Sequence, residues 1–412
     1  MKRSDIMLSS VGSVSQSLTK FGSFLPNTLS AGAAVQVLVF VSDEIFSKKT
    51  PILLTVDPIS SAILRAELAD SRKAEVWVNH WECLTDNGYC AAYLVCDEGR
   101  GLCKAGKEAL ADTFRQSDTY HAIAHILGQW VHRLENAAYK AIEAEDDAYK
   151  KLDSAKSDRV IDKRIDRYEK AGQAADEKIG LYETFGFLYQ CLIEQLNVFD
   201  KNGELRDREE AEENIKTGLD LIEGMGKTAI TNAVKKVRRT LPELLNYFDV
   251  AGEVVGKLEQ TCTDPDALHA LCLAWQWNKA AIKSKQTERT KRCTVNQEYC
   301  PEFATGHLQD EFDNIKEQVF NKLDQIVQSS AMAECVNSVI RPYLNTTKNK
   351  ISQNFLNLIM FYHNHRRYNE GKRKGKTPME ILSGKKQEKD WIDLLFDIIE
   401  QKDPYFFSGP RS

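Results

Sequence analysis

The fold is decided by residues 35–57, which contain VQVLVFVSDEIF (35–46) and PILLTVD (51–57) on either side of a Lys-Lys-Thr turn. Both segments are rich in the β-branched and aromatic residues that strands favour. Residues 60–68 (SSAILRAEL) form a third such segment. Because the gaps between the segments are short, successive strands are expected to pair antiparallel. The sequence therefore predicts a three-stranded meander.

A helix, another strand and a second helix are expected next. Residues 72–86 have helical spacing of apolar side chains, at Val76, Trp77, His80, Trp81 and Leu84. Residues 91–96 (AAYLVC) form a compact strand that stops at Asp97, and a helix is expected from about Leu102. This order is the opening of an RNase H-like layer fold. We therefore predict an α/β fold with a mixed sheet and flanking helices.

Helices are expected throughout residues 120 to about 330. Segment 137–213 is dense in Glu, Asp, Lys and Ala, which is typical of the solvated faces of long helices. An apolar stripe predicts packing into a bundle, through Leu181, Phe185, Leu188, Leu192 and Leu196. Residues 262–306, with four cysteines, are predicted to be rich in loops.

Further helices are expected near the two ends of the chain. Residues 12–21 are compatible with one short helix, and residues 309–341, 351–365 and 391–400 also have helical patterns. Thr377, Pro378 and Glu380 are typical of a capped helix start, with Thr as the N-cap residue, Pro at the first position and Glu at the third.

Composition excludes some classes of protein. The 412 residues are 42% hydrophobic and 28% charged, which is ordinary for a soluble protein. No run of 18 apolar residues predicts a membrane span, and residues 1–30 lack the apolar core of a signal peptide. We expect a cytoplasmic protein; association with the nucleoid, or a nuclear location in a eukaryotic host, is expected only if the chain acts on DNA.

The cysteines and the basic residues have informative distributions. None of the ten cysteines forms a C-x-x-C pair, so free thiols are favoured, although Cys293, Cys300 and His307 remain an alternative zinc set. The net charge is −5, yet residues 341–376 hold nine Lys or Arg and the single acid Glu370. A local basic tract of this kind is a candidate nucleic-acid contact.

Three acids are the candidate catalytic residues. We place Asp43 at the end of the first strand, Asp97 at the end of the fourth strand and Glu334 on a late helix. Phosphodiester chemistry uses such a cluster to hold two divalent ions roughly 3.5–4 Å apart. Mg²⁺, with Mn²⁺ as a substitute, prefers oxygen ligands and keeps several waters. An Asp at a strand end is more often a cap or a turn former, so the surrounding motifs decide the interpretation.

Those motifs resemble a known family. The segment Ala333-Glu334-Cys-Val-Asn337-Ser-Val-Ile-Arg341 resembles the glutamate helix of bacterial insertion-sequence DDE transposases and retroviral integrases, which have a basic residue seven positions after the catalytic Glu. Two helical turns separate Glu334 from Arg341, so both lie on one helix face. Asn337 is expected near the site.

Two further regions share this resemblance. Residues 361–368 (FYHNHRRY) and 375–380 (GKTPME) resemble the "Tyr-Asn-x-x-Arg … Gly-x-x-Thr-Pro-x-Glu" tail of integrase-type catalytic domains, with Asn364 displaced by one residue. Residues 42–46 and 95–101 resemble the strands that carry the first and second Asp. Asp118 and His121 resemble an Asp-x-x-His element, which implies that His121 is near the site. The resemblance covers residues 35–120 and 325–385.

The resemblance implies an RNase H-like domain that is interrupted by an all-α insertion, because 237 positions separate Asp97 from Glu334. The expected division is an N-terminal segment (1–30), for which the remnant of a DNA-binding domain is one alternative, a catalytic domain in two parts (31–120 and 321–390) around the insertion (121–320), and a tail (391–412).

The expected activity is metal-dependent cleavage of transposon ends and strand transfer to target DNA, by a homodimer or larger assembly and without membrane contact. Phosphate contacts are expected from Arg341, Lys348, Lys350, Arg366, Arg367, Lys372, Arg373, Lys374 and Lys376. The alternatives are a truncated or domesticated DNA-binding derivative, a nuclease of the same fold, and a helical scaffold in which the acids are incidental.

Overall fold

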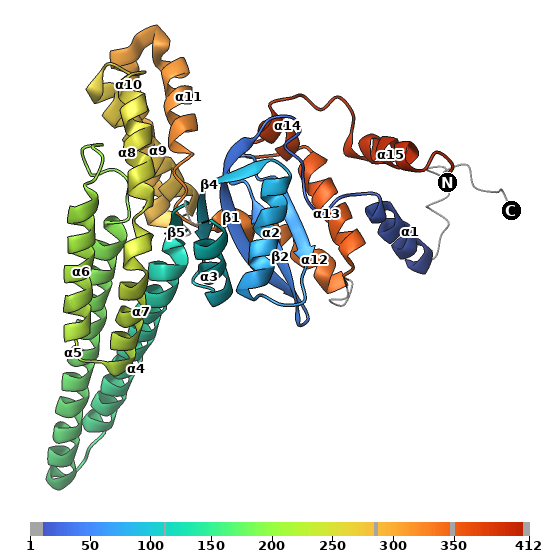
Figure 1. The fold of residues 1–412 in the computed structure, drawn as a ribbon. Helices are drawn as coiled ribbons and strands as arrows, with labels where there is room; N and C mark the ends of the chain where they lie inside the picture. The colour runs from blue at the N-terminus through green and yellow to red at the C-terminus, as the bar shows by residue number, and fades with distance from the viewer. Residues whose placement is uncertain (1–10, 111–112, 284–286, 347–350, 407–412) are drawn as a thin grey trace. The chain divides into compact units, whose positions relative to one another are not determined.

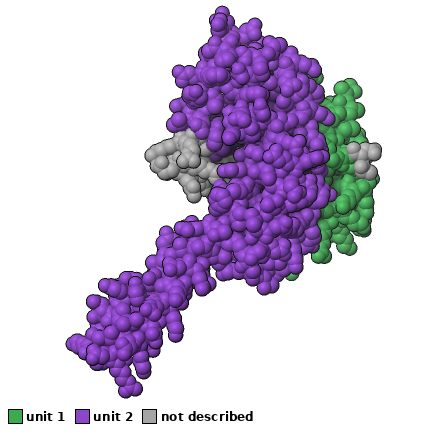
Figure 2. Space-filling model, turned by 90° about the vertical axis from the view of Figure 1, so that its left-hand side faces the viewer, with its two compact units in different colours: residues 1–118, 327–412 green, residues 119–326 purple. Residues whose placement is uncertain are grey.

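The chain folds into two compact units. The structure, a computed structural model, describes residues 11–110, 113–283, 287–346 and 351–406. Unit 1 comprises residues 1–118 and 327–412, and unit 2 comprises residues 119–326 (Figure 2). Unit 2 is therefore inserted into unit 1 between Asp118 and Val327.

A five-stranded mixed sheet forms the centre of unit 1 (Figure 1). Its strand order is β3-β2-β1-β4-β5, with antiparallel pairing in β1–β2 and β2–β3 and parallel pairing in β1–β4 and β4–β5. The strands are β1 (Gln36–Ser47), β2 (Thr50–Val56), β3 (Ile63–Leu68), β4 (Tyr89–Cys96) and β5 (Arg115–Ser117). The predicted meander is confirmed. The three residues of β5 were not predicted, because so short a strand has no periodicity of its own.

Two helices cover one face of the sheet. These are α2 (Ala74–Asp86) and α3 (Arg100–Ala109), and they share an apolar cluster with the even-numbered residue Phe40 of β1. Gly101 allows α3 to approach, because a Cβ there would lie 2.1 Å from the carbonyl oxygen of Arg72. The odd-numbered residues of β1 therefore face the other side, since side chains alternate along a strand.

The other face is covered by α12 (Ala331–Thr346) and α13 (Gln353–His365), which pack against β1, β2 and β3. Both ends of the described chain join this layer. Helices α1 (Val11–Ser23) and α15 (Trp391–Lys402) form one apolar cluster with α13, which includes Phe21, Leu25, Leu358, Phe361, Leu395 and Ile399. The predicted capping box of α14 (Pro378–Ser383), formed by Thr377 and Glu380, is confirmed.

A row of buried polar side chains crosses the sheet beneath α2. Trp81 Nε1 donates to Ser42 Oγ at 3.1 Å, Ser42 Oγ is bonded to Thr55 Oγ1 at 2.8 Å, and Thr55 Oγ1 lies 3.1 Å from His80 Nε2. Burial lowers the pKa of His80 to about 4, so the ring is neutral at pH 7. Every polar atom in this row has a partner, which removes the cost of burying it.

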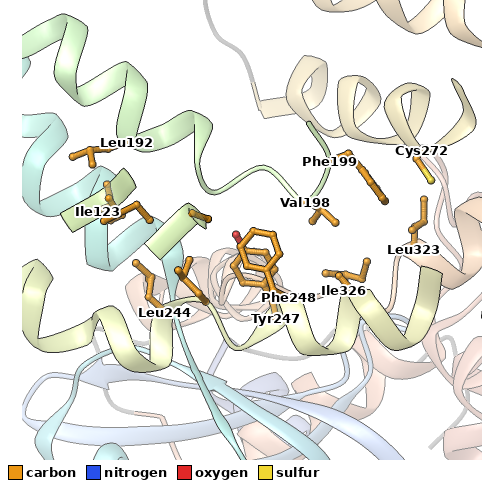
Figure 3. Packing of buried hydrophobic residues seen from close by; sticks show 14 of the residues in the cluster. Ile123, Leu192, Val198, Phe199, Leu244, Tyr247, Phe248, Cys272, Leu323 and Ile326 are labelled. Atoms are coloured by element: carbon orange, nitrogen blue, oxygen red, sulfur yellow. The ribbon is translucent and has the colours of Figure 1, made fainter. Parts of the chain in front are cut away.

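Unit 2 is helical and has its own core. Figure 3 shows part of that core, where Phe199, Tyr247 and Phe248 lie among aliphatic side chains from several helices. The helices are α4 (Ile126–Asp153), α5 (Asp158–Glu194), α6 (Arg208–Gly224), α7 (Thr228–Leu244), α8 (Tyr247–Glu259), α9 (Pro265–Lys283), α10 (Thr287–Leu308) and α11 (Phe312–Leu323), with a π-helical turn at Tyr120–His125 and a 3₁₀ turn at Gln309–Glu311.

The prediction that residues 262–306 are rich in loops is wrong, because α9 and α10 occupy most of this segment. The cysteines of this segment are compatible with helices. Cys262 and Cys272 are buried in the apolar core, where a free cysteine behaves as a small hydrophobic residue. Among the described residues, no helix combines the length and apolar character needed to cross a bilayer.

Candidate functional site

Asp43 lies inside β1. The prediction that it lies at the end of this strand is wrong. The strand continues to Ser47 because its antiparallel pairing with β2 extends beyond Asp43, which is opposite Leu54, to Ser47 and Thr50. As an odd-numbered residue of β1, Asp43 faces the side covered by α12. Its Oδ1 accepts a hydrogen bond from the Glu44 backbone N–H at 2.7 Å.

Asp97 directly follows β4, beside Asp43. The parallel register pairs Val41 with Val95, so the two acids follow paired residues by the same two positions and face the same side. Asp97 Oδ1 accepts from the backbone N–H of Gly99 at 2.8 Å. A Cβ at Gly99 would lie 2.9 Å from that oxygen, so this glycine permits the carboxylate its position.

Glu334 is in the first turn of α12, the helix that packs on β1 and β2. Asp118, which directly follows β5, fixes the start of this helix. Its Oδ2 accepts from the backbone N–H of Ser330 at 2.9 Å and from the hydroxyl of the same residue. Tyr93 of β4 adds a second tie, because its hydroxyl accepts from the Val327 N–H at 2.9 Å. The ends of the parallel strands thus position the helix that carries Glu334.

Asn337, one turn after Glu334, links α12 to the sheet. Its Nδ2 donates to Asp43 Oδ2 at 2.7 Å, the orientation that suits an ionised carboxylate, which can only accept. Its Oδ1 is then buried with no hydrogen-bond partner among the described residues. An unpaired buried oxygen is costly and marks a place where a donor, such as an ordered water, would be stabilised.

The three acids form one electrostatic group. Burial raises the pKa of Asp43 to about 7, and the negative charges of Glu334 and Asp97 add to this rise against the opposing hydrogen bonds from Glu44 and Asn337. Like charges disfavour ionisation of a neighbouring acid. The structure therefore brings Asp43, Asp97 and Glu334 within electrostatic reach of one another, across 291 positions of sequence between the first and the last.

The donor set fits hard divalent cations, although it is not a closed cage. Within the described part of the chain, no three His, Cys, Asp or Glu side chains already have the arrangement of a metal site. Among the described residues, two hydrogen bonds offset only part of the cost of ionising Asp43, and the Asn337 Oδ1 atom has no partner. Carboxylate oxygens with room for bound water are the environment that Mg²⁺ requires. Asp43, Asp97 and Glu334 are the residues that would hold such ions.

A cation at this site was missed from the sequence. Arg72 precedes α2, and its Nη1 forms an ion pair with Glu44 Oε1 at 2.7 Å. This pair raises the pKa of Arg72, and the charge of Asp97 contributes to the same rise. Glu44 therefore has a partner of its own, on the opposite face of β1 from Asp43. No motif surrounds Arg72 in the sequence, so only the fold could reveal it.

Arg341 lies on the same face of α12 as Glu334, as the spacing predicted. Its Nη2 is 3.3 Å from Glu334 Oε2, and both side chains are largely exposed. Such an exposed pair contributes little to stability, so Arg341 can exchange this partner for another anion at little cost.

The segments 361–368 and 375–380, called the tail motif below, hold the turn between β2 and β3. Asn364 Nδ2 donates to the carbonyl of Ile63 at 2.9 Å, and its Oδ1 accepts from the N–H of the same residue at 2.8 Å. His363 Nε2 is 2.8 Å from the carbonyl of Ser61, whose hydroxyl bonds to Tyr368 at 2.7 Å. Burial lowers the pKa of His363 to about 4, so the ring is neutral and donates this bond.

Several predicted phosphate contacts are engaged inside the fold. Arg367 forms an ion pair with Glu380 at 2.7 Å, and Arg373 donates to the carbonyls of Pro58 and Ile59 at 2.8 Å. Arg366 lies over the rings of Tyr362 and Tyr368, 5.4 and 5.8 Å from their centroids. These three arginines stabilise unit 1, which leaves fewer of their donors for a ligand.

Two of the predicted lysines are exposed and lack an ion-pair partner among the described residues, namely Lys374 and Lys376. Lys372 is also exposed, and partial burial of its ammonium together with Arg373 lowers its pKa. Lys348 and Lys350 lie outside the described residues. His121 belongs to unit 2, where its ring packs 5.4 Å from Tyr120 and 5.9 Å from His125.

The alternative zinc set has little support. His307 Nδ1 lies 2.9 Å from Asp264 Oδ2, Cys300 is a free thiol, and the Cys293 side chain lies outside the described residues. A cavity of about 530 Å³ does occur in unit 2, between Phe199, Leu205, Gly252, Gly256, Leu268 and His269 among others. None of the predicted site residues lines it.

Comparison with protein-family models and with curated proteins finds no match for this sequence.

Proposed function

We propose that this protein is a DDE-type DNA transposase, with an RNase H-like catalytic domain that cleaves transposon ends and joins them to target DNA. The observation that supports this most strongly is the grouping of Asp43, Asp97 and Glu334, since burial and the other two charges raise the pKa of Asp43 to about 7. Two acids that each lie two residues after the paired residues Val41 and Val95, and one acid on a covering helix, suit phosphodiester chemistry.

The strand order supports the RNase H-like part of the proposal. A meander followed by parallel strands β4 and β5 brings the end of β4 beside the part of β1 that carries Asp43, and neighbouring strands for the two Asp residues are what the resemblance implies. The point at which unit 2 is inserted, between Asp118 and Val327, also falls between the second acid and the third.

The roles of the residues follow from their places. Bound Mg²⁺ supplies activation of the attacking oxygen and stabilisation of the leaving oxygen. Asp43 and Asp97 provide oxygen ligands from a rigid sheet, and Glu334 completes the set from α12. Asn337 orients the Asp43 carboxylate and offers its unpaired oxygen to a water. Arg341, Lys374 and Lys376 are exposed cations for DNA phosphates.

The test is cleavage and strand transfer on duplex DNA with Mg²⁺. Cleavage by the unmodified protein must be lost in Asp97→Asn and retained in Asp70→Asn, a control that removes an exposed acid with no part in the site. Equal activity of Asp97→Asn and the unmodified protein overturns the site. Salt-dependent DNA binding with no cleavage under any metal condition favours instead the DNA-binding derivative.

A further inference from the structure

Helix α7 of unit 2 has an unusual charge distribution. It carries four cations, Lys235, Lys236, Arg238 and Arg239, and the single acid Glu243. The neighbouring helix α6 is rich in acids instead, with six of them between Glu209 and Glu223. A helix with this excess of positive charge is notable in a chain of net charge −5.

One of the four cations is neutralised within unit 2. Arg238 pairs with Asp220 and, at 3.4 Å, with Glu223. By contrast, Lys235, Lys236 and Arg239 are exposed and have no ion pair within the described residues. The fold therefore compensates the arginine that faces α6 and leaves the other three cations to solvent.

The three free cations share one face. At 100° per residue, Thr228, Asn232, Lys235, Lys236 and Arg239 fall within an arc of about 100°, and all five are exposed. The opposite side of the helix is buried through Ile230, Val234, Val237 and Leu241. We call the exposed set, from Thr228 to Arg239, the α7 basic face. It spans ~17 Å along the helix axis.

We propose that the α7 basic face binds the phosphate backbone of duplex DNA. This inference rests on the proposed function, because DNA is the ligand in both. It adds a contact surface in unit 2, whereas the three acids and the tail motif belong to unit 1. Over ~17 Å, duplex DNA presents about ten phosphates. Lysine, arginine and hydroxyl or amide side chains are the usual phosphate contacts. Between Thr228 and Arg239 the face has no acid and no apolar side chain, and the one acid on the same side of α7, Glu243, lies one turn beyond Arg239.

The test measures binding of a 30-base-pair duplex at KCl concentrations between about 50 and 300 mM, by fluorescence anisotropy and without metal. All proteins carry Asp97→Asn so that no DNA is cut. The test variant combines Lys235→Gln, Lys236→Gln and Arg239→Gln. A control variant removes three lysines of unit 2 that lie outside the α7 basic face, on α4, α6 and α8, by Lys150→Gln, Lys216→Gln and Lys257→Gln.

If three phosphates are contacted, the log–log salt slope of the test variant becomes shallower by about 2.7, because each contact contributes about 0.9. The control variant should keep the parent slope, and Lys235→Arg with Lys236→Arg should keep it too. Equal slopes for the parent and the test variant overturn the inference. Circular dichroism excludes misfolding, since glutamine is a good helix former.

This result is separable from that of the proposed function. A protein without metal-dependent cleavage can still show the slope difference, which would leave the α7 contact standing alone. Cleavage by the unmodified protein together with equal slopes would remove only the α7 contact.

Discussion

At the scale of the residue, Asp43 is the carboxyl group whose pKa the fold raises most among the described residues. Its pKa of about 7 in the folded protein lies above the ordinary value of 3.8, chiefly because it is buried. A folded pKa above the unfolded one contributes stability that is fully present below pH 3.8 and is lost as the pH rises through 7. Above pH 7, the ionised carboxylate therefore destabilises the metal-free protein.

Asp43→Asn should raise the unfolding temperature at pH 8.5 in EDTA and have little effect at pH 4. The gain arises because the amide resembles the protonated acid, and it should be on the order of 1–3 kcal/mol. Differential scanning fluorimetry measures it, with the exposed Asp70→Asn as the control. The unmodified protein should gain stability on addition of Mg²⁺, and Asp43→Asn should not. A variant less stable at pH 8.5 than the unmodified protein would refute this account.

Asn337 acts on the pKa of Asp43 in the direction opposite to burial. Its hydrogen bond lowers the pKa of Asp43, so Asn337→Leu removes a favourable partner of the carboxylate. The acid limb of the pH–rate profile for Mg²⁺-dependent cleavage should then move to higher pH. A lower rate with an unchanged acid limb would instead mean that Asn337 acts only through packing.

At the scale of the element, the close approach of α2 and α3 depends on one missing side chain. Gly101→Ala places a Cβ 2.1 Å from the Arg72 carbonyl oxygen, which is backbone and cannot rotate away. We expect a loss of about 1–3 kcal/mol in urea unfolding. Gly106→Ala, in the same helix, is the control, because its Cβ would meet only the flexible end of Leu94 at 3.2 Å. Equal stability of the two variants would contradict the inferred contact.

The tail motif contains both residues that hold the fold and exposed lysines that we propose contact DNA. Asn364→Leu leaves the N–H and carbonyl of Ile63 without their side-chain partners, which should cost about 2–4 kcal/mol. The double variant Lys374→Gln with Lys376→Gln should change stability little and should weaken DNA binding. Urea unfolding and anisotropy on the same proteins measure the two effects. If the lysine variant binds DNA as well as the unmodified protein, the loop is not a phosphate contact.

The sequence predicted these elements unevenly, for physical reasons. Strong local signals gave correct predictions, as for the β1–β2 turn and the capping box of Thr377 and Glu380. Long-range geometry left no local signal. Asp43 was wrongly placed at the end of the first strand, because pairing with β2 continues to Ser47 and leaves Asp43 inside β1. Arg72 became a site residue only through the packing of α2. Arg367 and Arg373 were predicted to contact DNA, but their positions depend on partners that the sequence does not reveal.

At the scale of the whole molecule, the two units have separate apolar cores. All residues of the largest cluster belong to unit 2, and the clusters around Trp81 and Phe361 belong to unit 1. Heat or denaturant should therefore unfold the chain in more than one step, because units with independent cores need not unfold together.

The point of insertion should allow unit 2 to be removed. Asp118 and Ser330 are joined by a hydrogen bond of 2.9 Å, so the two ends of unit 1 already meet. A chain in which four Gly or Ser residues connect Asp118 to Val327 should fold with a single transition and keep the Mg²⁺-dependent rise in stability, because all three acids remain. It should lose the part of the salt slope that the α7 basic face contributes, about 2.7. Calorimetry and anisotropy on this chain and on residues 119–326 alone measure these properties. A shortened chain that fails to fold, while residues 119–326 do fold, would mean that the sheet and α12 need unit 2 to hold Glu334 beside Asp43.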